Sequence, residues 1–121
     1  MVVLDTNVII GFLRGKTDVV EALNKYDPSE LATTFVNQYE LLKYMPRREL
    51  EKSIKNLTVY QLSEDSVASS SDAFKMLKEQ GNLISDNDLL IFGVCAANDE
   101  VLLTLDKDFA KLHSNRIILL K

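Results

Sequence analysis

Residues 2–10 read VVLDTNVII, and this stretch predicts the first strand of the fold. Its first three residues are apolar and β-branched or aliphatic throughout, which is typical of a strand covered on both faces of a parallel sheet. Asp5 follows this run at once. Ligands of an open parallel sheet bind beyond the carboxyl ends of its strands. The stretch therefore predicts a buried strand that ends at a carboxylate placed where a ligand would bind.

Four further runs share this apolar or β-branched character, at residues 31–34, 58–62, 101–105 and 117–120. Between them lie segments with helical spacing, predicted at 18–26, 35–44, 46–55, 64–81 and 86–98. Their starts carry residues that favour a helix N-terminus, namely Thr17, Thr34, Pro46, Ser63 and Ser85. Strands that alternate with helices predict an α/β fold with right-handed crossovers.

The longest apolar run, LLIFGVCAA at 89–97, is predicted to be a buried helix rather than a strand. Its length and the Ser-Asp-Asn-Asp sequence before it favour this interpretation. Gly93 costs a helix about 1 kcal/mol relative to Ala. A close approach of this helix to the sheet would explain the glycine.

Length and charge narrow the functional classes. A chain of 121 residues fits one domain, 1–121. Fourteen Lys and Arg against eighteen Asp and Glu give a net charge of −4, which argues against a basic clamp held to nucleic acid by phosphate attraction. An enzyme that acts on nucleic acid through a carboxylate metal site remains compatible with this charge.

The single cysteine, Cys95, predicts neither a disulfide framework nor a cysteine zinc site. The nine-residue run at 89–97 is far shorter than the roughly 20 residues that span a bilayer. The N-terminal sequence has no basic region of the kind found in signal peptides. We therefore expect a reduced, cytoplasmic protein with no membrane contact.

Five acidic residues are candidates for a site. Asp5 and Asp106 each follow a predicted strand, so they point to one edge of the sheet. Asp86 and Asp88 lie in the first turn of the predicted buried helix, and Glu40 lies beside the apolar face of another helix. An unpaired charge in such a place is costly, so Glu40 requires a partner.

Taken singly, each acid has an ordinary structural role. These roles are a helix cap for Asp5, a favourable helix-dipole position for Asp86 and Asp88, a cap for Asp106 with Asp108 in the first turn, and an ion pair with Lys43 for Glu40. Taken together, converging carboxylates would repel one another unless a cation neutralised them. Oxygen ligands of this kind select Mg²⁺ or Mn²⁺ rather than zinc.

Four strings in order carry a resemblance to a known family: VVLDTNVII, NQYELLKY, SDNDLLIFGVCAAND and LLTLDKDF. Across residues 2 to about 120 the chain resembles the PIN-domain nucleases, and within them the small VapC-type toxins. The family more often has two small residues where this chain has Phe92 and Gly93. The resemblance implies a three-layer fold with a central, mostly parallel five-stranded sheet flanked by helices.

By their motif positions, four acids match the catalytic and metal-binding residues of that family: Asp5, Glu40, Asp88 and Asp106. The supporting polar residues that it implies are Thr6 and Asn7 after the first acid and Thr104 before the fourth. The resemblance implies that the chain hydrolyses RNA phosphodiester bonds with Mg²⁺ or Mn²⁺. The resemblance also implies that the chain is the toxin of a type II toxin–antitoxin pair, that it forms a homodimer, and that a small antitoxin protein is its partner.

Contact with RNA requires positive charge on this acidic protein. Arg14 and Lys16 are the candidates because they lie nearest Asp5 in the sequence. A second group of cations, Lys43, Arg47, Arg48, Lys52 and Lys55, is interleaved with Glu49 and Glu51. That group is typical of a solvated helix face with pairs such as Glu51–Lys55.

Two alternatives stay open at the level of sequence. The chain could be a PIN-type nuclease that processes RNA without being a toxin. It could also be a receiver-like signalling module, which shares the α/β class and an acidic metal pocket. Such modules have a pair of early acids, whereas Leu4-Asp5-Thr6 offers one.

Overall fold

The computed structural model describes residues 1–120, and at its centre is a parallel sheet. The five strands are β1 (Val2–Leu4), β2 (Leu31–Thr34), β3 (Thr58–Tyr60), β4 (Val101–Thr104) and β5 (Ile117–Leu119). Their order is β3-β2-β1-β4-β5, and every neighbouring pair is parallel. The predicted five-stranded sheet is confirmed, and it is wholly rather than mostly parallel. The last three strands are one or two residues shorter than predicted.

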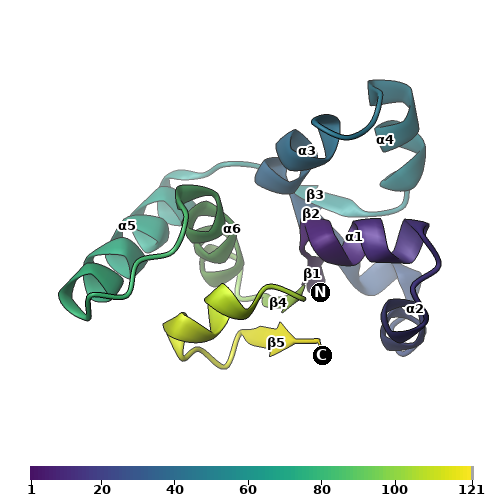
Figure 1. Ribbon diagram of the computed structural model, residues 1–121. Helices are drawn as coiled ribbons and strands as arrows, with labels where there is room; N and C mark the ends of the chain where they lie inside the picture. The colour runs from purple at the N-terminus through teal and green to yellow at the C-terminus, as the bar shows by residue number, and fades with distance from the viewer. Residues whose placement is uncertain (121) are drawn as a thin grey trace.

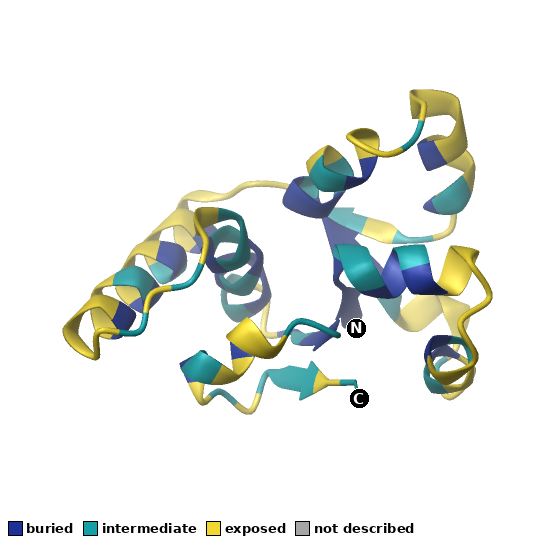
Figure 2. Cartoon of the chain, in the orientation of Figure 1, coloured by how far each residue is buried: buried dark blue, intermediate teal, exposed yellow. Residues whose placement is uncertain are grey.

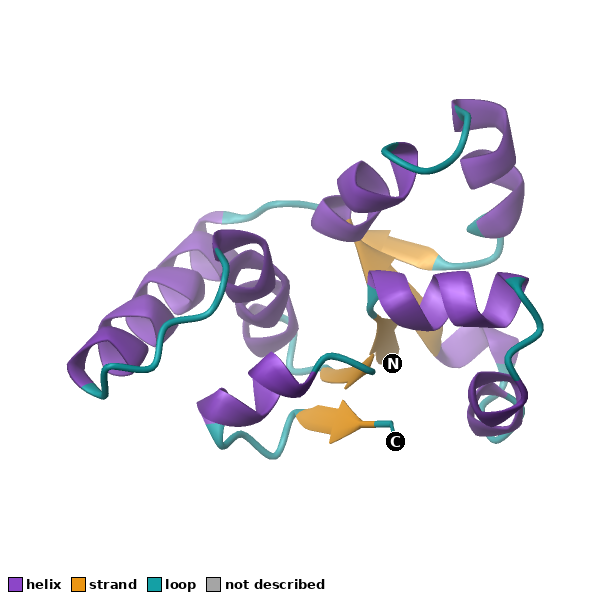
Figure 3. Ribbon diagram, viewed as in Figure 1, coloured by secondary structure: helices purple, strands orange, loops and turns teal. Residues whose placement is uncertain are grey.

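Five helices follow the predicted order, and a further helix begins directly after Asp5, the residue predicted as a helix cap (Figure 3). They are α1 (Thr6–Leu13), α2 (Thr17–Leu23), α3 (Phe35–Leu42), α4 (Arg47–Ser53), α5 (Glu64–Glu79) and α6 (Asp86–Ala97), with 3₁₀ turns η1 (Pro28–Glu30) and η2 (Lys107–Leu112). Thr34, Ser63 and Ser85 cap their helices as predicted. Thr17 does not, because α2 already begins at Thr17 and Lys16 occupies the cap position without a side-chain hydrogen bond. None of the helices in residues 1–120 is both long and apolar enough to cross a membrane.

The sheet is covered on both faces, so the fold has three layers (Figure 1). Alternate residues of β1 point to opposite faces. Val3 joins an apolar core formed with α5, α6 and η2, whereas Val2 and Leu4 join a core formed with α1, α2 and α4. Figure 2 shows buried residues on the central strands and on the inward sides of the helices, whereas the edge strands β3 and β5 carry none. The predicted three-layer α/β fold is therefore confirmed.

Gly93 permits a close approach between two helices. A Cβ at this position would overlap the Ser70 hydroxyl of α5 and would lie 2.5 Å from the Ser66 carbonyl oxygen. The expectation that Gly93 allows α6 to approach the sheet is wrong, since its nearest neighbours belong to α5. The sequence does not distinguish the two cases, because small residues on a helix permit close contact with another helix as well as with a sheet.

The strand order also determines where a site can form. From β1 the chain moves outward through β2 to β3, then crosses back by way of α5 and α6 to place β4 on the other side of β1. The direction of winding therefore reverses between β1 and β4. In open parallel sheets, such a reversal leaves a crevice at the carboxyl ends of the two strands.

Candidate functional site

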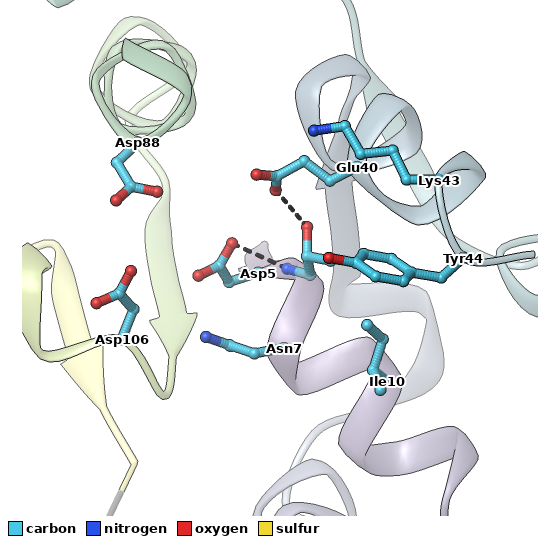
Figure 4. A pocket seen from close by; sticks show the side chains of 9 residues that line it. Asp5, Asn7, Ile10, Glu40, Lys43, Tyr44, Asp88 and Asp106 are labelled. Atoms are coloured by element: carbon cyan, nitrogen blue, oxygen red, sulfur yellow. Dashed lines mark hydrogen bonds between the residues drawn. The ribbon is translucent and has the colours of Figure 1, made fainter. Parts of the chain in front are cut away.

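A pocket of about 250 Å³ lies at this reversal, and four predicted acids line it. They are Asp5, Glu40, Asp88 and Asp106, whose side chains point into the same space from separate elements (Figure 4). Thr6 and Asn7 line the pocket as well. Residues that are distant along the chain are thus brought together, as the sequence predicts.

The topology explains this convergence. Asp5 caps α1 directly after β1, and Asp106 caps η2 just after β4. Glu40 comes from α3, which begins at the carboxyl end of β2. Asp88 lies in the first turn of α6, the helix that returns to β4, so its N-terminus is at the same edge of the sheet. The predicted capping roles of Asp5 and Asp106 are real and coexist with their place in the pocket.

Asp5 is the buried member, with 4% of its surface exposed. The Thr6 backbone N–H and the Asn37 Nδ2 donate to its Oδ1 at 2.9 and 3.1 Å. The Thr104 hydroxyl donates to its Oδ2 at 2.6 Å. These donors come from α1, α3 and β4, so three elements fix the orientation of one carboxylate.

Glu40 is held by a different set of donors and does not pair with Lys43, so the alternative of an ion pair is wrong. The Thr6 hydroxyl donates to its Oε1 at 2.6 Å, and the Asn87 Nδ2 donates to its Oε2 at 3.3 Å. Asn37 Nδ2 also donates to the Thr6 hydroxyl at 3.0 Å. The two carboxylates are therefore joined through one threonine and one amide.

Asp88 and Asp106 face each other on the side of the pocket opposite Glu40 (Figure 4). Oxygens of Asp88, Asp106 and the more exposed Asp108 lie within 4.8 Å of one another. The Asp108 backbone N–H donates to Asp106 at 2.9 Å, and Lys111 Nζ lies 3.6 Å from the Asp108 carboxylate. Asp108 is thus close enough to assist, whereas Asp86 is exposed and does not line the pocket.

Burial and the crowding of acids both affect the pKa values in the pocket. Burial raises the pKa of Asp5, against the opposing effect of its Thr104 and Thr6 hydrogen bonds. Burial, with Asp106 and Asp5 nearby, raises the pKa of Asp88 from 3.8 to about 7. Both shifts mean that the ionised carboxylates are less stable in the pocket than they would be in water.

These residues fit a hard divalent cation. The donors available in the pocket are carboxylate, hydroxyl and amide oxygens, the ligand types that Mg²⁺ and Mn²⁺ prefer. The carboxylates of Asp88, Asp106 and Asp108 approach within 4.8 Å, which is close enough for their oxygens to share one ion, although Asp108 does not line the pocket. A cation would also neutralise the charge that raises the pKa of Asp88.

The supporting residues that the sequence suggests have definite partners. The Leu105 backbone N–H donates to Asn7 Oδ1 at 3.1 Å, which ties the start of α1 to the end of β4. Thr104 donates to Asp5 and accepts from the Asp106 backbone N–H at 3.0 Å. Thr104 thereby sets the spacing of two acids.

Sequence reasoning missed Asn37 and Asn87. Asn37 is fully buried and accepts hydrogen bonds from the Thr34 backbone N–H and hydroxyl through its Oδ1. Its place three residues before Glu40, on the same side of α3, is the signal that could have revealed it. Asn87 precedes Asp88 and carries no comparable signal.

The cations are arranged differently from the expectation. Arg14 and Lys16 are exposed at the end of α1 remote from Asp5 and do not line the pocket, so their contact with RNA stays a prediction. Lys43 does line the pocket. On α4 the ion pair joins Arg47 and Glu51 at 3.5 Å, in place of the Glu51–Lys55 pair.

Comparison with models of known protein families identifies one that matches this chain. The model of the PIN domain matches residues 2–114. No curated protein sequence matches the chain.

Three solved structures illustrate the likeness of fold. A toxin–antitoxin complex from Klebsiella pneumoniae is 20% identical, with a TM-score of 0.78 over 98% of this chain and 96% of that one. VapBC-1 from nontypeable Haemophilus influenzae is 23% identical, with a TM-score of 0.82 over 98% of each chain. VapBC-5 from Mycobacterium tuberculosis, a member of the VapBC family of toxin–antitoxin systems, is 25% identical, with a TM-score of 0.72 over 98% and 96%. The family match over nearly the whole sequence, together with the shared fold, shows that this chain belongs to the PIN domain family.

Proposed function

We propose that the protein is a divalent-metal-dependent endoribonuclease that hydrolyses RNA phosphodiester bonds. The observation that carries this proposal is the convergence of Asp5, Glu40, Asp88 and Asp106 in one pocket at the reversal point of the sheet. A pocket that disfavours its own charge is suited to a cation, and membership of the PIN family supports nuclease chemistry.

The chain's own residues would do different parts of the work. Asp5 is fixed by three donors, so it would hold its cation ligand position without rearrangement. Asp88 and Asp106 would complete the ligand set from the opposite side, with Asp108 within reach. Mg²⁺ or Mn²⁺ would lower the pKa of a water and stabilise charge that develops on the scissile phosphate.

Glu40 lies on the other side of Asp5, where Thr6 and Asn87 orient both of its oxygens. In this position it would bind the cation or accept a proton from the attacking water. Neither role requires a serine or cysteine nucleophile.

Cleavage of RNA by the purified protein tests the proposal. Labelled single-stranded RNA should be cut with Mn²⁺ or Mg²⁺ and left intact with EDTA, and sequencing of the ends would identify the bond. Asp5→Asn should abolish cleavage with the fold intact by circular dichroism. Cleavage at the wild-type rate by that variant would show that the acids do not form the active site.

We also propose that this nuclease is the toxin of a type II toxin–antitoxin pair and that it acts in the cytoplasm as a homodimer. The support is that each of the three structures described above comes from a toxin–antitoxin system. Phe12 and Leu13 are exposed by 46% and 45% beside an apolar hollow, a surface of the kind that protein partners cover.

Expression in bacteria tests the toxin role. Wild-type protein should arrest growth, Asp5→Asn should not, and the product of a small neighbouring gene should relieve the arrest and co-purify with the protein. Harmless overexpression of an active nuclease would favour an RNA-processing role instead. Sedimentation at micromolar concentration would show whether the protein is a dimer.

A further inference from the structure

The acidic pocket has a second wall that carries no carboxylate. Ile10 of α1 and Tyr44, two residues after the end of α3, line it together with Lys43. Figure 4 shows Tyr44 and Ile10 across the pocket from Asp88 and Asp106. The pocket therefore has an acidic half and an aromatic half.

Packing does not account for Tyr44. Its surface is 74% exposed, more than that of any other large apolar or aromatic side chain in residues 1–120. A tyrosine left in solvent contributes little to a core, yet its ring is directed at the pocket. An exposed ring beside a polar pocket offers a flat apolar face to a ligand.

Lys43 is held at the edge of the same wall. Its Nζ lies 4.7 Å from the centroid of the Tyr39 ring, a cation–π distance. Within the described part of the chain it forms no ion pair, and it is the one cation among the residues that line the pocket. It is therefore free to meet a negative group that enters the pocket.

We propose that Tyr44 is a stacking platform for a nucleobase of single-stranded RNA, and that Lys43 contacts a backbone phosphate next to it. This inference rests on the proposed nuclease function and specifies its substrate. Bases stack on aromatic side chains regardless of their identity, and only unpaired bases can be splayed out to do so. A base on Tyr44 would hold the adjoining phosphate towards the acidic half of the pocket.

Steady-state cleavage of a single-stranded oligoribonucleotide tests this inference. Tyr44→Ala should raise KM about five- to 150-fold with little change in kcat, which corresponds to the 1–3 kcal/mol that base stacking contributes, at 1.36 kcal/mol per tenfold. Tyr44→Phe keeps the ring and should restore most of the loss. Leu42→Ala is the matched control, since Leu42 is exposed on α3 but does not line the pocket.

Two further measurements separate stacking from a general effect. A 2-aminopurine base in the oligoribonucleotide should lose fluorescence on binding to wild-type protein and not on binding to Tyr44→Ala. Lys43→Gln should lower the slope of log affinity against log salt by about 0.7, the value for one phosphate of a single strand.

The outcomes distinguish this inference from the proposed function. If the wild type cleaves RNA but Tyr44→Ala has the same KM, the platform is refuted and the nuclease stands. Equal KM values for double-stranded and single-stranded substrates would also refute it, as would a Tyr44→Ala defect confined to antitoxin binding. If the wild type cleaves no RNA with metal present, the proposed function fails and the platform with it.

Discussion

Replacing Asp88 with asparagine should stabilise the metal-free protein above neutral pH. The pKa of Asp88 rises from 3.8 to about 7 because of burial and the nearby Asp106 and Asp5 carboxylates. The folded state thus binds the Asp88 proton more tightly than the unfolded chain does. The free energy of unfolding therefore falls as pH rises between these two values and is level above about 7. Asparagine has nearly the same shape as aspartate and carries no charge, so the substitution removes this loss of stability.

The size of the effect follows from the same shift. At about 1.36 kcal/mol per pH unit, a rise from 3.8 to about 7 corresponds to roughly 4 kcal/mol, which is a ceiling. Asp88 is only partly buried, and solvent screens its neighbours. We therefore expect Asp88→Asn to gain about 1–2 kcal/mol at pH 8 and less than half of that at pH 5.

Urea unfolding in EDTA at both pH values measures this difference. Asp86→Asn is the matched control, because Asp86 lies in the same first turn of α6 but is exposed and outside the pocket. Each substitution removes one favourable charge from the helix N-terminus, which costs about 0.3–1 kcal/mol. The comparison of the two variants isolates the combined effect of burial and neighbouring carboxylates on Asp88.

Addition of Mn²⁺ should reverse the order of stability. A ligand that binds the folded state at 100 times its Kd stabilises it by about 2.7 kcal/mol, and Asp88→Asn should bind more weakly than the wild type. If Asp88→Asn is no more stable than Asp86→Asn at pH 8 in EDTA, the buried charge of Asp88 among its neighbouring carboxylates does not limit stability and the reasoning is wrong.

Three other substitutions test the surrounding structure. Asn37→Ala removes one donor to Asp5 and should cost about 1–3 kcal/mol in urea unfolding and weaken Mn²⁺ binding by calorimetry; unchanged binding would contradict its orienting role. Thr104→Val keeps the side-chain shape but loses the hydroxyl that donates to Asp5, so cleavage should fall, and full activity would count against this bond. Gly93→Ala should destabilise by roughly 1–3 kcal/mol through overlap with Ser70, despite about 1 kcal/mol gained in helix propensity, and an unchanged melting temperature would disprove the close contact.

The positions of the acids at the strand ends could be predicted because strand topology constrains them. A residue that follows a parallel strand must lie at the carboxyl edge of the sheet, whatever the details of packing. Asp5 and Asp106 follow from this rule alone. Glu40 and Asp88 are candidates by their helix positions, but choosing Asp88 over Asp86 requires the motif resemblance, since a position within a helix indicates no particular depth in the pocket.

Other features depend on how the helices rotate and pack, which the patterns in the sequence do not reveal. Asn37 and Glu40 share a side of α3, but only the packing of α3 against α1 and β2 brings Asn37 to Asp5. Proximity in the sequence favoured Arg14 as the cation near Asp5, yet α1 carries it away from the pocket while α3 brings Lys43 to it. The contact of Gly93 with α5 likewise depends on how two helices pair.

The hydrogen bonds divide the pocket into a fixed side and an adjustable side. Asp5 is buried and receives three donors from three elements, so its orientation is part of the fold. For Asp88, burial and neighbouring acids outweigh the Ser85 hydroxyl that favours its charged form. Loss of a donor to Asp5 leaves a buried charge less satisfied and should reduce stability whether or not metal is present. Loss of the Asp88 charge should increase the stability of the metal-free protein and decrease only that of the metal-bound protein. Opposite changes in stability in EDTA therefore distinguish the two sides of the pocket.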